Sequence, residues 1–289
     1  MADSPGSHAG ATARAIRSHY DAGNDFFAAW LDPSMTYSAG RWGDGPAGPS
    51  DLHHAQLAKL DWHLDAARVQ GGSLLDIGCG WGSLLFRAAT ERGVSDLTGI
   101  TASPNQADWI RGHAGNLPIS ILAGAWQQAV LDRSFDAIVS VGAMEHFVGP
   151  GLGSDEKIRI YRDFFGFCHR HLNPGGRMSI QFIAWMDLKG RKEEEVLPLE
   201  LFPESTLPCP IEVLTAADSG FHLVALENRP SDYSRTLTAW LDHLAANRDR
   251  LIAAHGKDLV IRHVRGFRRF ILGFEGGTIG LFRVVLQRR

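Results

Sequence analysis

The sequence predicts an α/β protein in which helices cover both faces of one mainly parallel, seven-stranded sheet. Two observations carry this expectation. Short apolar segments alternate with helix-like segments from residue 73 onward, a pattern typical of parallel strands joined by crossover helices. A glycine-rich turn also follows the first apolar segment, at 74–82. With 289 residues, 44% of them apolar, the chain can bury one large core.

Each element is expected from its local pattern. Strands are expected at 73–77, 96–100, 118–122, 135–141, 176–183, 221–227 and 279–287. Helices are expected at 12–30, 51–69, 83–92, 104–114, 155–172, 232–254 and 258–272. The segment 51–69 shows the helical period most clearly, with apolar residues three and four positions apart at Leu57, Leu60, Leu64 and Ala67.

The chain is expected to have three parts. Residues 1–10 are small and polar and predict a disordered tail. Residues 11–70 predict a helical cap, and 71–289 the main α/β domain. The strand and helix pattern breaks at about 184–210, which holds a charged run and four prolines, so we expect a lid insertion there.

Composition excludes some partners. The net charge is −3, with 29 basic and 32 acidic residues, which argues against a nucleic-acid partner. No segment is long enough to span a membrane, and the start has no signal pattern, so we expect a cytoplasmic protein that is not integral to a membrane. The basic cluster 265–269 is expected to be a solvated helix face. Apolar residues along 258–272 could form the face of a homo-oligomer, although core packing is the default.

Cysteine and histidine residues do not predict a metal site. The three cysteines lack metal-ligand spacing and are expected to be buried without a disulfide: Cys79, Cys168 and Cys209. Three histidines fall on one helix, but no carboxylate or cysteine completes a site, so we expect them on the surface: His53, His54 and His63.

The glycine-rich turn predicts a cofactor site. Asp76 is followed by Gly78, Gly80 and Gly82, and a helix is expected from Ser83. Glycine permits the tight turn and lets a ligand approach the backbone. The N–H groups at a helix start favour a polar or anionic ligand. We therefore expect a nucleotide-type cofactor at the tip of the first strand.

The identity of that cofactor follows by exclusion. A phosphate-binding loop would need a Lys before Ser or Thr, and there is none here. A dinucleotide fingerprint would place a glycine at Ser83 and an acid at the tip of the second strand, whereas Asp96 lies at that strand's beginning. Asp-x-Gly-x-Gly-x-Gly without a Lys is the pattern of S-adenosylmethionine (SAM) methyltransferases. A structural turn without a ligand remains the alternative.

Six further segments stand in a characteristic order: His19–Phe27, Leu31–Ala39, Ala55–Leu60, Gly99–Gln106, Gly142–Phe147 and Tyr233–Trp240. Together they resemble the cyclopropane fatty acid synthase and mycolic acid cyclopropane synthase family of SAM-dependent methyltransferases, from about residue 15 to near the end. The resemblance implies the class I SAM-methyltransferase fold, which is Rossmann-like, with N-terminal helices and a lid insertion.

The resemblance also implies how SAM would be held. Gly78 and Gly80 would approach its methionine part, and Trp126 would flank its adenine, although a Trp is often simply core. Gln127 stands where the family has an acid, so an amide would have to serve the adenine. The expected cofactor contacts are Tyr37, Ser38, Asp76, Gly78, Gly80, Thr101, Gln106, Trp126, Gln127 and Val141.

On the acceptor side the resemblance implies a bicarbonate ion as base, held by a Glu, a His, a Tyr and backbone groups. Glu145 matches the Glu and Tyr233 the Tyr, while Gln181 stands at the His position and cannot titrate. Ala39, usually Cys in the family, and Val141 match backbone contributors. The expected catalytic residues are thus Glu145, Tyr233, Gln181 and His146. Three of them have a structural alternative: Glu145 as a helix-start carboxylate, Tyr233 in local packing and His146 as a support beneath the site.

Our primary interpretation is a SAM-dependent C-methyltransferase acting on an alkene or electron-rich carbon of a small apolar metabolite, through a carbocation-like intermediate near Glu145. This interpretation depends on Gln181 and Ala39, which depart from the His and the Cys that the resemblance implies at these positions. The alternative is a cyclopropane synthase acting on unsaturated acyl chains of phospholipids. N- or O-methylation and SAM binding without catalysis are further alternatives, since Glu145 and His146 could deprotonate a nucleophile.

Overall fold

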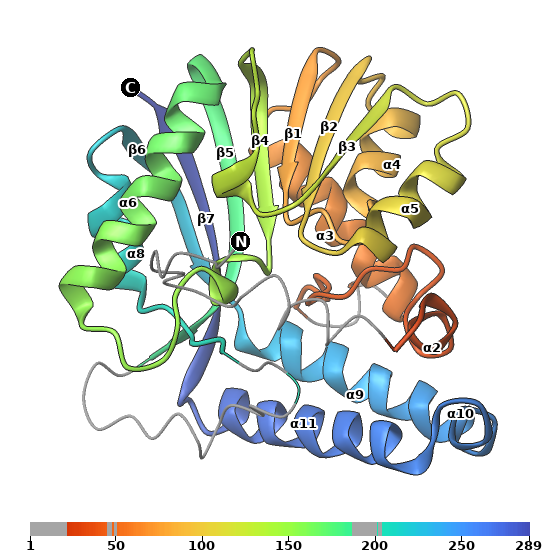
Figure 1. Cartoon of the computed structure of the whole chain (residues 1–289). Helices are drawn as coiled ribbons and strands as arrows, with labels where there is room; N and C mark the ends of the chain where they lie inside the picture. The colour runs from red at the N-terminus through yellow and green to blue at the C-terminus, as the bar shows by residue number, and fades with distance from the viewer. Residues whose placement is uncertain (1–21, 45–47, 49–50, 187–200, 202–203) are drawn as a thin grey trace, which may run out of the picture.

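The computed structural model describes residues 22–44, 48, 51–186, 201 and 204–289. Its sheet has seven strands in the order β3-β2-β1-β4-β5-β7-β6 (Figure 1). Neighbours from β3 to β5 pair in parallel, and β7 runs antiparallel to β5 and β6. The strands are β1 (Ser73–Ile77), β2 (Asp96–Thr101), β3 (Ile119–Ala123), β4 (Phe135–Val141), β5 (Leu172–Trp185), β6 (Phe221–Asn228) and β7 (Ile279–Arg288). The predicted sheet is confirmed.

The helices among the described residues are α2 (Asn24–Ala28), α3 (Leu52–Ala66), α4 (Ser83–Glu91), α5 (Pro104–His113), α6 (Ser154–His171), α8 (Pro210–Ala217), α9 (Pro230–Ala246), α10 (Arg248–His255) and α11 (Lys257–Glu275). Two short 3₁₀ turns, η1 (Trp126–Gln128) and η2 (Met144–His146), follow β3 and β4. Local signals explain several starts: Asp51 caps α3 by accepting from the His54 N–H, and Ser103 caps α5 ahead of a proline.

Some predicted elements need correction. The helix expected at 232–254 is two helices, because at Asn247 the backbone leaves helical geometry and the side-chain amide donates to the Ala29 and His243 carbonyls. Helix α8 lies where no helix is expected from the sequence; it starts at Pro210, the last proline of the expected insertion, and proline is well suited to the first position of a helix. Strand β5 begins at Leu172, four residues early, across an irregular pairing with β4.

Other expectations fall on residues outside the described part. The tail at 1–10 and the first half of the helix expected at 12–30 lie there; within the described part, α2 covers only 24–28 of that helix. Most of the lid expected at 184–210 also lies outside the described residues. The division of the chain into tail, cap and domain stays a prediction.

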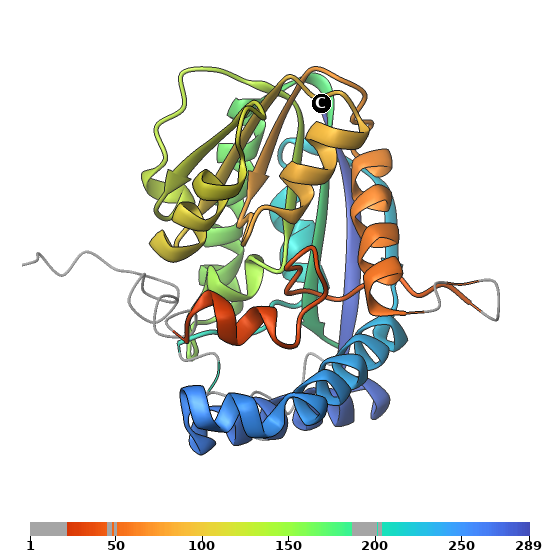
Figure 2. The ribbon, with the colours of Figure 1, turned by 90° about the vertical axis from the view of Figure 1, so that its right-hand side faces the viewer.

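Apolar faces of the helices pack on both sides of the sheet. Leu60 and Leu64 of α3 join Leu84 and Leu85 of α4 and the apolar residues of β1 and β2 in one core. Phe164 of α6 belongs to the core on the other side, with α8 and strands β4, β5 and β7. Figure 2 shows the sheet nearly edge-on, with α3 on one side and α6 on the other.

A third layer lies at the edge of the sheet where the parallel strands end. Helices α9, α10 and α11 run along this edge, with α2 beside them (Figure 1). An aromatic core joins them: Phe27, Trp240 and Phe267 are all buried, and the ring of each contacts the buried ring of Trp30. This layer covers the strand ends at which ligands of open α/β sheets bind, so it bounds the candidate site.

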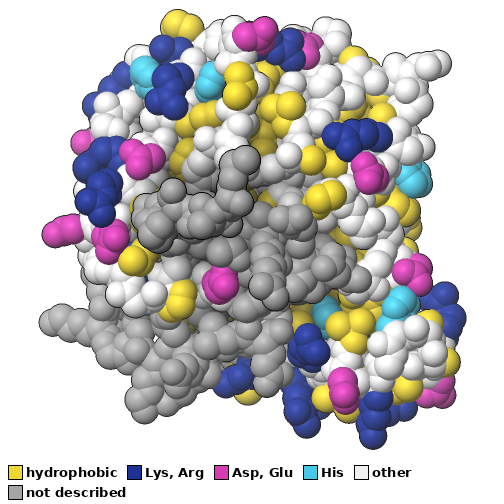
Figure 3. Space-filling model, viewed as in Figure 1, with side chains coloured by type: hydrophobic (Ala, Val, Ile, Leu, Met, Phe, Trp, Pro, Cys, Tyr) yellow, Lys and Arg dark blue, Asp and Glu magenta, His cyan; other side chains and the backbone are white. Residues whose placement is uncertain are grey.

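The outer face of this layer is charged. Lys and Arg side chains gather over α10 and α11 (Figure 3). Within the predicted basic cluster, Arg265, Arg268 and Arg269 are exposed while Gly266 and Phe267 are buried, as expected for a solvated helix face. Among the described residues, no helix combines the length and the apolar character that crossing a membrane requires.

Candidate active site

Two pockets open at the carboxyl ends of the strands and meet at Tyr37, Ser38 and Gly142. The first, here named the glycine pocket, has about 530 Å³ of space and follows the turn after β1. The second, the carboxylate pocket, has about 670 Å³ and contains Glu145. Both volumes include space open to solvent. Since Tyr37, Ser38 and Gly142 line both, the two pockets are direct neighbours.

The turn that forms the glycine pocket needs its glycines for two different reasons. Gly78, Gly80 and Gly82 have φ of +80°, +56° and +82°, a region that side chains disfavour. A Cβ at Gly78 would lie 2.6 Å from the Ala143 Cβ, whereas a Cβ at Gly80 would meet nothing within 4 Å. Gly78 therefore permits close packing of the turn on the next strand end, and Gly80 leaves open space toward the pocket.

A buried acid and a buried cation both line the glycine pocket. Asp76, at 3% exposure, has its pKa raised to about 7 by burial, with the Lys59 charge acting against the rise. Lys59 is 1% exposed and donates from Nζ to Ser38 Oγ at 3.1 Å. Burial lowers the Lys59 pKa to about 7, while the carboxylates of Asp32 and Asp76 oppose this. Lys59 was not predicted as a site residue.

A hydroxyl behind the pocket orients an amide inside it. Thr101 Oγ1 donates to Gln106 Oε1 at 2.7 Å, and Gln106 Nε2 is buried without a hydrogen-bond partner among the described residues. Gln106 lines the glycine pocket and Thr101 does not. A donor is therefore held toward the pocket, ready for a ligand oxygen or ring nitrogen. Tyr37, Ser38, Asp76, Gly78, Gly80 and Val141 line this pocket as well.

Two residues predicted near the adenine do not line either pocket. Trp126 is buried against Phe147, Phe164 and Phe167, and its Nε1 has no hydrogen-bond partner among the described residues. Gln127 is exposed beside it. The packing corresponds to the structural alternative for Trp126, and the adenine contacts of both residues stay predictions.

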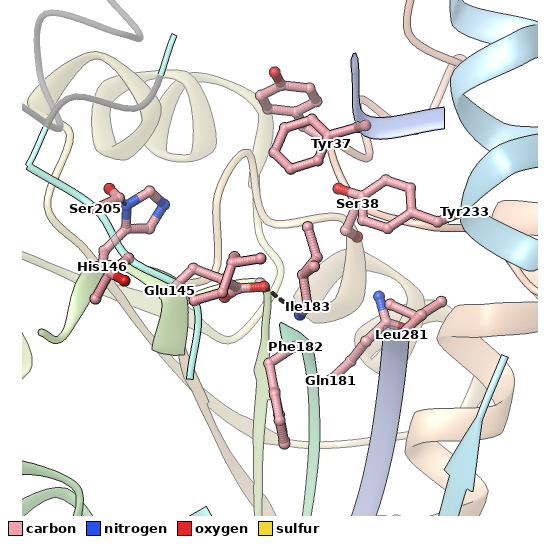
Figure 4. Close-up of a pocket in the computed structure, with 14 residues that line it drawn as sticks. Tyr37, Ser38, Glu145, His146, Gln181, Phe182, Ile183, Ser205, Tyr233 and Leu281 are labelled. Atoms are coloured by element: carbon pink, nitrogen blue, oxygen red, sulfur yellow. Dashed lines mark hydrogen bonds between the residues drawn. The ribbon is translucent and has the colours of Figure 1, made fainter. Parts of the chain in front are cut away.

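Glu145 is the principal acid of the carboxylate pocket. It lies on η2, just past the end of β4, and is 8% exposed. Its Oε1 accepts the main-chain N–H of Ile183 at 2.7 Å (Figure 4). Its Oε2 is buried with no hydrogen-bond partner among the described residues. Burial raises the Glu145 pKa to about 7, against the hydrogen bonds that favour the ionised form. A carboxyl with such a pKa can both accept and release a proton near neutral pH.

His146 lies beside Glu145 on the same side of the pocket (Figure 4). Its Nδ1 is 2.8 Å from Ser205 Oγ. Burial lowers the His146 pKa to about 4, so the imidazole is neutral at pH 7. The neutral imidazole can therefore donate or accept a hydrogen bond with a ligand, but it is a weak base.

Gln181 and Tyr233 line the opposite side of the carboxylate pocket, together with Ser38 (Figure 4). The four predicted catalytic residues, Glu145, His146, Gln181 and Tyr233, are thus brought together from η2, β5 and α9. The backbone contributor Ala39 is fully buried and lines neither pocket. Apolar side chains complete the wall: Phe182, Ile183, Leu207, Phe270 and Leu281.

The prediction that His63 lies on the surface is wrong. The residue is 0% exposed, and its Nδ1 is 2.8 Å from Ser179 Oγ on β5. Its pKa stays well below the usual value, because of burial and then of the Lys59 and Arg283 charges. The helical period shows why: His63 follows Lys59 by four residues, so both face the sheet from α3.

Arg283, a second buried cation, was also missed. It is 0% exposed and pairs with Asp232 at 2.8 Å. One signal was available, since Arg283 is a lone charge inside the apolar strand 279–286, and a charge in such a position must find a buried partner. The three cysteines are buried, as predicted.

Comparisons with known proteins agree with this arrangement. The family model of mycolic acid cyclopropane synthetase matches residues 8–283. Cyclopropane mycolic acid synthase 1 of Mycobacterium tuberculosis is 32% identical over 292 residues, covering 94% of this chain and 96% of the relative. Cyclopropane mycolic acid synthase 2 of Mycobacterium leprae is 34% identical over 266 residues, covering 85% and 84%.

Solved structures show the same fold. The cyclopropane synthase MmaA2 from Mycobacterium tuberculosis superposes with a TM-score of 0.85 at 28% identity, covering 96% of this chain and 99% of the other. The mycolic acid cyclopropane synthase CmaA1 complexed with SAH and CTAB gives 0.83 at 29% identity, covering 95% and 98%. With its glycine turn, its paired pockets and these matches, the chain belongs to the mycolic acid cyclopropane synthetase family of SAM-dependent methyltransferases.

Proposed function

We propose that this enzyme transfers a one-carbon unit from SAM to the double bond of an unsaturated acyl chain and closes a cyclopropane ring. The names of the relatives favour this substrate class over the small apolar metabolite that we first preferred. The observation that carries the proposal is the junction of the two pockets at Tyr37, Ser38 and Gly142, with Glu145 on the acceptor side.

The glycine pocket suits SAM on its own evidence. Gly80 leaves room for a ligand against the backbone, and helix α4 starts directly after Gly82. Gln106 holds an unpartnered buried donor toward the space, and Asp76 supplies an acid. When bound, SAM supplies an electrophilic methyl group and leaves as S-adenosylhomocysteine. The residues proposed to hold it are Tyr37, Ser38, Asp76, Gly78, Gly80, Gln106 and Val141.

The carboxylate pocket suits the acyl chain that accepts the methyl group, and it holds a group that can take up the proton released later in the reaction. The π electrons of the acyl double bond would form the new C–C bond and leave a cation on the other carbon. Loss of one proton from the added methyl group would then let its C–H electrons close the ring. Glu145, whose pKa is about 7, is the proposed proton acceptor, and the apolar wall excludes water from the cation.

A bicarbonate ion is the second ligand proposed for the carboxylate pocket. The Gln181 amide can donate to an anion although it cannot titrate, and Tyr233 lines the same wall. Protonated Glu145 could donate a third hydrogen bond. In that arrangement the ion would take the proton and Glu145 would hold the ion.

A second candidate is methylation of a small apolar metabolite without ring closure. Gln181 favours it, since the residue departs from the His that the family resemblance implies. The two products differ in isotope content. The enzyme should be incubated with methyl-deuterated SAM and vesicles of monounsaturated phospholipid, and the acyl chains analysed by mass spectrometry. A gain of two deuteriums would establish the ring. A gain of three would establish methyl transfer, and no gain despite bound SAM would reject acyl chains as the acceptor.

A further inference from the structure

Arg283 is a fully buried cation that contacts the predicted His position of the carboxylate pocket. It lies on β7 directly opposite Gln181 in the β5–β7 ladder. Its Nε donates to Gln181 Oε1 at 2.7 Å. A guanidinium has donors and no acceptor, so the amide oxygen must face Arg283 and the NH₂ group must face away from it.

The other nitrogens of Arg283 donate hydrogen bonds to residues on neighbouring elements. Nη1 donates to Asp232 Oδ2 at 2.8 Å and to Glu227 Oε1 at 3.2 Å, and Nη2 donates to the Gly40 carbonyl at 3.0 Å. Asp232 directly precedes Tyr233 on α9, and Gly40 ends the N-terminal segment that lines both pockets. The buried charge is therefore paired with two carboxylates. Three of its four partners, Gln181, Gly40 and Asp232, belong to segments that line the carboxylate pocket.

The orientation of Gln181 limits what it can do. The residue is 2% exposed, and Figure 4 shows the end of its side chain directed toward Ser38 and Tyr233. With its oxygen occupied by Arg283, the amide offers only N–H groups to the pocket and to the buried imidazole of His63, which it also contacts. A ligand atom that meets it must be a hydrogen-bond acceptor, and proton uptake must occur elsewhere, at Glu145 or at an ion beside it.

We propose that Arg283 is a positioning residue that sets the direction of the Gln181 amide, so that the carboxylate pocket receives a fixed N–H donor opposite Glu145. The expected effect of Arg283 on turnover rests on the proposed function, whereas its expected effect on the direction of the Gln181 amide does not. Arg283 acts through Gln181 and lines neither pocket itself.

Arg283→Lys tests the proposal, with Arg41→Lys as the matched control. Arg41 also pairs with Glu227 and lies over the Trp62 ring, as Arg283 does, but no contact joins it to Gln181 among those described. Glutamine side chains labelled with ¹⁵N report the amide directly, and the Gln181 signal is assigned by its loss in Gln181→Glu. Arg283→Lys should shift or broaden this signal and lower kcat at least tenfold, with KM for SAM within threefold. Arg41→Lys should leave the Gln181 signal in place and both kcat and KM for SAM within twofold of the parent enzyme.

Gln181→Glu covers the case in which Arg283→Lys does not fold. This variant keeps an oxygen on Arg283 and replaces the donor that faces the pocket with an acceptor. It should keep the thermal midpoint and SAM affinity and lose at least thirtyfold in kcat, which a purely structural role for Gln181 would not produce. An unchanged Gln181 signal in Arg283→Lys, or full turnover in Gln181→Glu, would overturn the proposal. If the parent enzyme turns over no acyl chain, the proposed function fails. The Gln181 amide signal in Arg283→Lys then decides by itself whether Arg283 orients Gln181.

Discussion

The main-chain N–H of Ile183 holds one oxygen of Glu145 at 2.7 Å and leaves the other oxygen without a hydrogen-bond partner among the described residues. This contact fixes the carboxyl plane while Oε2 stays available to the pocket. A buried acceptor without a partner costs about 1–3 kcal/mol of folding free energy. Such a cost is expected where a group must bind or deprotonate a ligand, so the asymmetry of Glu145 supports the role proposed for it.

The first prediction concerns catalysis by Glu145. Glu145→Gln keeps an oxygen for the Ile183 N–H but cannot accept a proton. If Glu145 takes the proton, kcat should fall roughly 10²- to 10⁴-fold, the usual contribution of a general base. SAM affinity should stay within threefold, because Glu145 does not line the glycine pocket. Steady-state rates with unsaturated phospholipid vesicles and calorimetric SAM binding measure the two effects. A loss of SAM binding equal to the loss of rate would contradict the assignment.

The second prediction concerns stability and pH. Burial raises the Glu145 pKa from its usual 4.5 to about 7. Below pH 4.5 the carboxyl is protonated in both states and contributes nothing. Between pH 4.5 and 7 the folded state holds more protons, so this group lowers stability as pH rises, and above pH 7 its cost is on the order of 3 kcal/mol. Glu145→Gln should therefore raise the thermal midpoint by several degrees at pH 8 and by little at pH 4.5.

Glu212→Gln is the control for this measurement. Glu212 is equally buried, but both its oxygens have donors, Ser154 Oγ at 2.9 Å and the Cys209 N–H at 3.1 Å. In Glu212→Gln the amide oxygen can keep the Cys209 N–H and the Ser154 hydroxyl can turn to accept from the NH₂, so this variant should gain no stability at either pH value. If Glu145→Gln also gained no stability at pH 8, the Glu145 carboxylate would have unrecognised partners.

The fold and the glycine pocket could be predicted because their signals are local. Asp76 to Gly82 are contiguous, and the alternation of strands and helices determines that they lie at the carboxyl edge of the sheet. Glu145 was recognised in the same way, from the residues around it just after β4. Helix boundaries were less accurate where a distant contact decides them, as at Asn247 and the Ala29 carbonyl.

Buried polar residues were predicted poorly because their partners are distant in the sequence. Arg283 pairs with Gln181 and Asp232, which lie 102 and 51 positions away. His63 on α3 meets Ser179 on β5, 116 positions away. An amphipathic pattern marks such residues as exceptions to an apolar face, yet only the assembled sheet shows what pairs with them. Trp126 is the reverse case: its ring packs on Phe164 in the core beside the site, and its adenine contact stays a prediction.

The third prediction separates two glycines of the turn. Gly80→Ala should leave the fold largely intact, with a loss of about 1 kcal/mol for its positive φ, because its Cβ meets nothing within 4 Å. That Cβ points to open space where the cofactor is proposed to lie, so SAM affinity should fall at least tenfold. Gly78→Ala places a Cβ 2.6 Å from the Ala143 Cβ and should lower the thermal midpoint much more. Equal SAM affinity in Gly80→Ala and the parent would place the cofactor elsewhere.

The fourth prediction concerns the charges of the glycine pocket. Lys59 and Asp76 both line the space proposed for SAM, which carries a positive sulfonium that S-adenosylhomocysteine lacks. A nearby ammonium disfavours the sulfonium by about 1 kcal/mol in a partly solvated pocket, and a carboxylate favours it similarly. Lys59→Met, measured below pH 7 where the ammonium is charged, should therefore shift the ratio of the two dissociation constants roughly three- to tenfold toward SAM. Asp76→Asn, measured above pH 7 where the carboxylate is ionised, should shift the ratio the other way. Calorimetric titration with both ligands measures the ratio directly. If Lys59→Met weakens both ligands equally, Lys59 instead binds a group that they share, such as the carboxylate of the amino-acid part.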